Sequence, residues 1–190
     1  MNRLHATLLS FCLLLAACGS VPPAPSDRFY RLQPVSVSSA SKALPSAVAV
    51  QTFRADSLYA ERPIIHAEES SLRQLRQYHY HLWLYSPAQI VQGHFVASLG
   101  SAFDISGGSN APFVVDGRIL GFERVMSGKN SKAVVALELR LLAGGKTLLN
   151  RTYQAEQAAA DDSLDAFAVA MEQALAKIYA EFLADLARTS

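Results

Sequence analysis

Cys18 is the residue whose surroundings best suit a chemical modification. It follows the tripeptide Leu-Ala-Ala at positions 15–17, which resembles the lipobox of bacterial lipoproteins, where small residues admit a peptidase and the thiol receives a diacylglyceryl group. Arg3 and the apolar run at positions 6–17 have the profile of a signal peptide, and the run is shorter than the ~20 residues of a membrane span. We therefore expect removal of residues 1–17 and anchoring through acyl chains, palmitate among them, on Cys18. The alternative is an unmodified cysteine just beyond an ordinary cleavage site.

His79 and His81 are the residues next best placed for chemistry, since on a strand both would point to the same side, as two metal ligands do. No further Cys, His or carboxylate follows them at ligand-like spacing, and their neighbours Tyr78, Tyr80 and Trp83 are aromatic. This setting favours histidines at a sheet surface over a metal site, so no metal is expected.

Two pairs of carboxylates could in principle share acid and base roles. Glu68-Glu69 is more typical of a solvated loop, and Asp161-Asp162 of a helix start, where acidic side chains favour the positive end of the helix dipole. The sequence contains no Gly-x-Ser-x-Gly motif and no phosphate-binding Gly-rich loop, and the mature chain would have no free thiol. The expectation is a protein that is not an enzyme and binds no cofactor.

Charge and cysteine content restrict the class of protein further. The total of 17 Lys and Arg includes Arg3, so the mature chain would balance its 16 Asp and Glu, and a neutral chain argues against a nucleic-acid partner. Cys12 would leave with the signal peptide, so no disulfide is expected and the fold depends on its core. We expect a Pro-rich tether at 18–27 and a single periplasmic domain at 28–190.

Four segments before residue 86 have the alternation, or the β-branched and aromatic content, of strands. They are residues 29–32, 47–53, 63–67 and 72–85. The last segment concentrates aromatic side chains, although half of those on such a strand should belong to the core. We propose a candidate docking or lipid-contact surface on this segment, formed by Tyr78, Tyr80, His81 and Trp83.

A helix is predicted to begin after Ser86. Ser86 can cap, Pro87 suits the first helical position, and Gln89 completes a capping box. Gly100 is placed to end this helix in a left-handed turn.

The second half of the chain predicts a meander and a long amphipathic helix. Residues 113–125, 132–142 and 146–155 are expected to form consecutive antiparallel strands, and residues 164–186 carry an apolar stripe at helical spacing after an N-cap at Asp161 or Asp162. A membrane-surface role for this helix is the alternative to core packing, which we favour because the sheet needs a cover. The predicted fold is an α/β (α+β) two-layer sandwich, with a mixed or mainly antiparallel sheet covered on one face by two helices.

The order of these features resembles the PqiC-like auxiliary lipoproteins of ABC-type transport systems. The matching features are the lipobox cysteine, Phe-Tyr-Arg-Leu at 29–32, Arg-Pro-Ile-Ile at 62–65, the segment from Tyr80 through Ser86-Pro87 into a helix, and the meander with its Ala-rich final helix. Membership implies a role beside an ABC transporter whose substrate-binding subunit carries an Mce domain, moving lipids or hydrophobic compounds. The ATPase, the permease and the Mce-domain protein would be separate partner chains.

Gly19 and Ser20 stand where lipoproteins kept at the inner membrane commonly carry Asp, so the anchor is expected in the outer membrane, facing the periplasm. The competing class is a structural or assembly lipoprotein of another outer-membrane machine, without a transport role. The oligomeric state stays open, with a homo-oligomer as one option.

Overall fold

A long meander forms the centre of the sheet. The computed structural model describes residues 25–37, 47–100, 102, 104–105 and 111–189; Cys18 and the tether up to residue 24 lie outside the described residues. The strands β6 (Phe113–Ser127), β7 (Asn130–Ala143) and β8 (Lys146–Ala158) pair in sequence, all antiparallel. This confirms the predicted meander, and each strand extends beyond its predicted end.

The free edge of β6 is occupied by three short parallel strands in succession. They are β2 (Val48–Val50), β3 (Arg54–Ala55) and β4 (Pro63–Glu68). The strand β5 (Arg76–Trp83) then pairs antiparallel with β4, and β1 (Arg28–Tyr30) pairs parallel with β5, giving the order β1-β5-β4-β6-β7-β8. Of the predicted strand at 47–53 only β2 forms, and β3 begins one residue beyond its predicted end. Two 3-10 turns, η1 (Ser57–Ala60) and η2 (Glu69–Ser71), join these segments, and η2 delays the start of β5.

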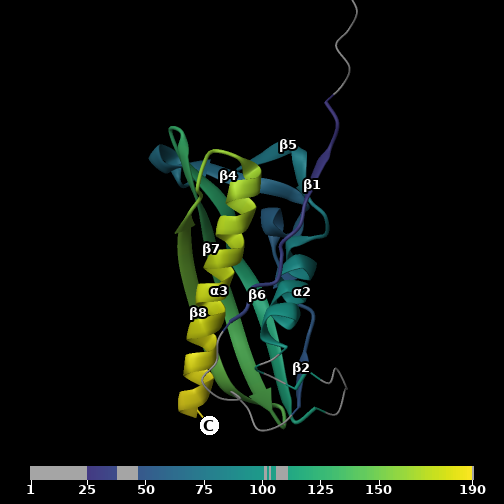
Figure 1. Ribbon diagram of the computed structural model, residues 1–190. Helices are drawn as coiled ribbons and strands as arrows, with labels where there is room; N and C mark the ends of the chain where they lie inside the picture. Colours follow the sequence, from purple (N-terminus) through teal and green to yellow (C-terminus); the bar gives the residue numbers. More distant parts are fainter. Residues whose placement is uncertain (1–24, 38–46, 101, 103, 106–110, 190) are drawn as a thin grey trace, which may run out of the picture.

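Two helices cover one face of this mixed sheet, α2 (Pro87–Leu99) and α3 (Leu164–Thr189), as Figure 1 shows. The stripe of α3 is fully buried at Phe167, Met171, Leu175, Ile178 and Phe182. It meets the inward face of β7, whose alternate residues from Ala133 to Leu141 are at most 1% exposed. The two-layer α/β architecture is therefore confirmed. In the described part of the chain neither helix combines the length and apolarity needed to cross a membrane.

The helix ends agree with the sequence at one place and differ at two. The capping box of α2 is present, with the backbone N–H of Ser86 donating to Gln89 Oε1 at 3.3 Å. Gly100 has a right-handed conformation, with φ −58°, so the predicted left-handed end of α2 is wrong. The chain continues in a right-handed turn, in which the N–H of Ala102 donates to the carbonyl of Leu99. The N-cap of α3 is neither aspartate.

Ser163 caps α3, because it lies next to the first helical residue and its Oγ accepts the N–H of Ala166 at 3.0 Å. Asp161 instead accepts the N–H of Ser163 at 2.8 Å. Hydrogen bonds with the side chain and the backbone of Ser163 lower the pKa of the Asp161 carboxyl. Aspartate and serine are both good N-cap residues, so the sequence predicted the region where the helix begins. Ser163 is the cap because it directly precedes Leu164, the first residue of α3.

Candidate functional site

Trp83 does not belong to the candidate docking surface. Its side chain is 1% exposed, with ring centroids 5.2 Å from Phe122 and 6.0 Å from Phe167. The alternation of β5 sends it to the face that the helices cover, so its placement on the surface was wrong and it is a core residue.

His81 and Tyr78 contact each other because β5 is irregular. The pairing shifts between Pro63, which lies opposite Leu82, and Ile65, which lies opposite Gln77. Tyr78 and His81 then meet edge to face at 5.5 Å although they are three positions apart. His81 Nδ1 is 2.9 Å from Tyr30 Oη, and burial, with a smaller effect of Arg28, lowers the pKa of the imidazole.

His79 stays exposed, with its ring 6.4 Å from that of Tyr80. Among the described residues no group of three or more His, Cys, Asp or Glu is close enough to hold a metal ion. A hollow of about 180 Å³ lies beside η2 and the β6–β7 hairpin. Its lining includes Glu69, Val125 and Ser131.

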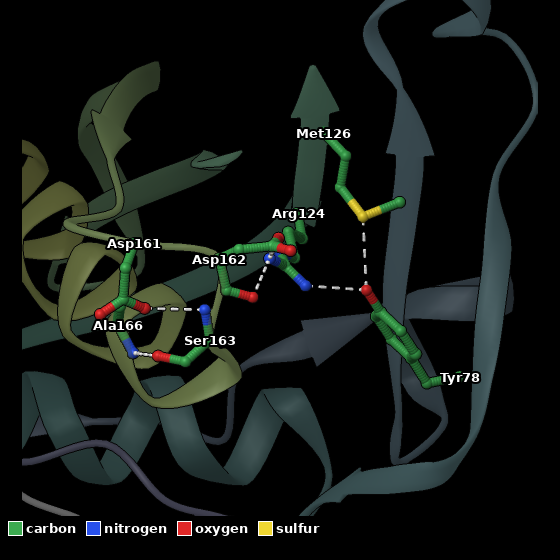
Figure 2. A network of polar contacts seen from close by, with 7 residues as sticks. All are labelled: Tyr78, Arg124, Met126, Asp161, Asp162, Ser163 and Ala166. Atoms are coloured by element: carbon green, nitrogen blue, oxygen red, sulfur yellow. Dashed lines mark hydrogen bonds and ion pairs between the residues drawn. The ribbon is translucent and has the colours of Figure 1, made fainter. Parts of the chain in front are cut away.

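Tyr78 ties the sheet to the start of α3 through Arg124. Figure 2 shows the Arg124 guanidinium between Tyr78 and Asp162. Its Nη1 donates to Tyr78 Oη at 2.9 Å, and its Nη2 donates to the Asp162 carboxylate at 2.7 Å and carbonyl at 2.8 Å. The hydroxyl of Tyr78 donates in turn to Met126 Sδ at 3.4 Å. Asp162 is therefore more than a solvated helix-start residue, since it pairs with an arginine that is 4% exposed.

The rest of the aromatic segment is open to solvent. Tyr80 is 43% exposed and Tyr85 is 59% exposed, and Leu84 beside it is 39% exposed. The four predicted residues thus separate into a core residue (Trp83), two residues bonded within the fold (Tyr78 and His81) and one surface residue (Tyr80). Strict alternation around a buried Trp83 would have pointed to Leu84, but nothing in the spacing signals the irregularity at Tyr78.

A polar contact that the sequence did not reveal holds the segment after β1, residues 31–37, which we call the strap. Figure 1 shows it running between α2 and α3. The N–H of Gln33 donates to Glu172 Oε1 at 2.6 Å, and its carbonyl accepts from His94 Nε2 at 2.9 Å. The N–H of Val35 donates to Ser98 Oγ at 3.1 Å. The strap therefore connects β1 to both helices.

His94 is held neutral at the centre of these contacts. It is 4% exposed, and burial lowers the pKa of its imidazole to about 4, against a smaller opposing effect of the Gln33 carbonyl. With the proton on Nε2, Nδ1 can accept the Tyr179 hydroxyl at 3.2 Å. Burial raises the pKa of Glu172, opposed by the bond from Gln33 N–H. Both groups favour their uncharged forms on folding.

Solved structures share this architecture. No protein-family model matches the sequence, and no curated protein sequence is significantly similar to it. The crystal structure of protein XCC0632 from Xanthomonas campestris, of the DUF330 family model, is 18% identical with a TM-score of 0.73, covering 85% of this chain and 96% of that one. A crystal structure of an uncharacterized protein is 19% identical with a TM-score of 0.64, covering 86% and 98%. At these identities the likeness concerns the fold, and the chain has the same fold as the Xanthomonas protein over most of both lengths.

Proposed function

We propose that the chain is a lipoprotein, anchored through Cys18 in the outer membrane at its periplasmic face, that serves an Mce-type ABC transport system as an auxiliary docking component. The observation that carries the proposal is the lipobox cysteine ten residues ahead of Arg28, the first residue of β1. Gly19 and Ser20 in place of Asp support the outer membrane. The transport role comes from the resemblance in the order of features, and the cargo class it implies is lipids or other hydrophobic compounds.

The sheet offers two surfaces for a protein partner. One is its face opposite the helices. The other is β8, the last strand of the sheet, where a run of 13 residues has no further strand paired to its outer edge in the described part of the chain. An edge of this length can accept an extended segment of a partner through backbone hydrogen bonds. Leu148 on β8 is 45% exposed and would contribute apolar contact. Anchoring would raise the effective concentration of such a partner at the membrane.

Replacement of the lipobox cysteine tests the anchor. Several acyl chains on one residue hold a protein at a membrane almost permanently, since each buried CH₂ contributes about 0.8 kcal/mol. Cys18→Ala should abolish fatty-acid labelling and move the protein to the soluble fraction on fractionation. A variant that stays in the membrane pellet would contradict lipid anchoring. Lys146→Ala, an exposed change at the start of β8, serves as the control with unchanged labelling.

Affinity purification of the lipidated protein from membranes tests the transport role. Co-purification of an ABC permease, an ATPase and an Mce-domain protein would support it, and recovery should fall for a variant with Leu148→Arg on β8. Recovery of an outer-membrane assembly complex in their place would favour the competing structural role. Adjacent genes for an ATPase, a permease and an Mce protein would be an independent indication.

A further inference from the structure

Exposed apolar side chains gather at one end of the molecule. Among the described residues, five of the large apolar side chains that stay exposed lie on β1, on β5 or within a few residues of β5: Phe29, Leu72, Tyr80, Leu84 and Tyr85. Figure 1 shows β1 and β5 side by side at the end opposite the C-terminus. We call these five side chains, with the arginines at 28, 31, 73 and 76, the β1–β5 edge.

The register of the two strands turns part of this edge away from the helices. Phe29 lies beside Leu82 and Tyr30 beside Trp83 in the parallel pair, and Leu84 N–H donates to Tyr30 O at 2.7 Å. Because side chains alternate, Phe29 and Leu84 share the outer face, whereas Tyr30 and Trp83 pack toward the core. Phe29 and Leu84 therefore belong to the half of the pattern that the fold does not bury, whereas Leu72 and Tyr85 lie outside the strand.

The β1–β5 edge carries more positive than negative charge. Residues 25–32 and 72–85 contain four arginines, all exposed, and one acidic residue, Asp27, while Glu68 and Glu69 precede the edge and Glu69 shares a hollow with Leu72 and Arg73. A fifth arginine, Arg62, holds its guanidinium 5.1 Å from the Phe29 ring centroid while its Nε donates to Trp83 O at 3.1 Å. Tyrosine, leucine and arginine together are typical of surfaces that lie at the headgroup level of a bilayer, and the arginines complement anionic lipids.

The point where the chain enters the fold lies at this edge. The described residues 25–27 lead directly into β1, and ten residues from Cys18 to Arg28 span at most about 35 Å. Once Cys18 is acylated, the β1–β5 edge is the part of the fold attached closest to the lipid. A reach this short keeps the local concentration of bilayer surface at the edge high.

We propose that the β1–β5 edge rests on the bilayer that carries the anchor, with its tyrosines and leucines at the acyl boundary and its arginines on anionic lipid phosphates. This inference rests on the lipid anchor of the proposed function. The proposal gives the molecule one orientation on the membrane. The helices and β8 extend away from the bilayer, and the outer edge of β8 stays accessible to a protein in the periplasm.

Depth-sensitive labelling of the mature lipoprotein tests the orientation. The mature chain has no cysteine other than acylated Cys18, so Tyr85→Cys and the control Leu148→Cys each give one site for an environment-sensitive fluorophore. The proteins are reconstituted in phosphatidylethanolamine and phosphatidylglycerol vesicles with nitroxide-labelled lipid. We expect a blue shift and at least twofold quenching at position 85, and the emission of a label in water at position 148. Equal, water-like emission at both positions would overturn the proposal.

A matched pair of charge changes tests the role of the arginines. Arg73→Glu should reduce the quenching at position 85, whereas Lys146→Glu, an equal charge change at the exposed start of β8, should leave it unchanged. Equal effects of both variants, or shielding of position 85 only after an isolated periplasmic partner is added, would overturn the membrane assignment. The mass of the N-terminal peptide is measured separately: an unacylated Cys18 would refute the anchor, and acylation with a water-exposed position 85 would refute the orientation alone.

Discussion

Trp83 and Tyr85 lie two positions apart and belong to two regions that use aromatic side chains in opposite ways. Trp83 is 1% exposed in the helix-covered core, where it packs on Phe122 and Phe167. Tyr85 is 59% exposed at the β1–β5 edge. The core also buries polar groups, and His94 and Glu172 there are hydrogen-bonded to the strap. The edge leaves apolar groups in water beside arginines.

This contrast separates residues that fold the protein from residues available for binding. A buried aromatic side chain contributes several times more to stability than an exposed one, because only burial removes its surface from water. The exposed tyrosines and leucines gain little for folding, so their clustering at the tether end favours a role in contact with another surface.

Truncation of the two aromatic residues should give the largest difference. Trp83→Ala leaves a cavity beneath α3 and should lower the free energy of unfolding by about 3–5 kcal/mol. Tyr85→Ala should change it by no more than about 0.5 kcal/mol, as usual for an exposed site. Urea unfolding followed by far-ultraviolet circular dichroism measures both. Similar losses for the two variants would break the division into core and edge.

Much of the core was predictable because its apolar residues recur with the periods of a strand and of a helix. The alternation of β7 and the spacing of three and four in α3 identified the inward residues, and both patterns are local. The edge was only partly predictable, since the irregularity of β5 brings Tyr78 and His81 together against the alternation. The pairing of β2, β3 and β4 along one edge of β6 involves distant segments, and no local pattern encodes it.

The contacts of His94 with the strap should make the stability of the fold sensitive to acid. His94 is neutral in the fold, with its pKa lowered from 6.5 to about 4, so the unfolded chain binds a proton more readily between these values. The stability contributed by His94 is therefore present above pH 6.5 and is lost as the pH falls toward 4. This amounts to about 2 kcal/mol between pH 7 and pH 5, from 1.36 kcal/mol per pKa unit.

Two other histidines act in the same direction, because burial also lowers the pKa of His66 and His81. Glu172 opposes them, since its raised pKa favours the protonated carboxyl in the fold as the pH falls through that value. The difference between the wild type and His94→Gln isolates the His94 contribution. Urea midpoints at pH 7 and pH 5 should fall less for His94→Gln, and a parallel fall in both proteins would contradict the assignment.

The strap itself could not have been predicted from the sequence. Gln33 is bonded to residues 61 and 139 positions away, and a single histidine on an apolar helix face gives no indication of its partner. The same holds for the Arg124 contacts with Tyr78 and Asp162, which join β6, β5 and the start of α3. The sequence placed Tyr78 on the right strand but could not assign its hydroxyl to a buried guanidinium.

Asp162, just before α3, is joined through Arg124 to Tyr78 on β5. Its replacement should lower the free energy of unfolding less than Trp83→Ala does. Asp162→Asn weakens the pair with Arg124 but leaves the guanidinium its bonds to Tyr78 Oη and the Asp162 carbonyl. Asp162 is 62% exposed, so we expect a loss of roughly 1–2 kcal/mol, between the values for surface and buried pairs. Asp165→Asn, in the first turn of α3, is the control and should have less effect. Equal urea midpoints for the two variants would mean that the carboxylate pair of Asp162 with Arg124 adds nothing to the attachment of α3.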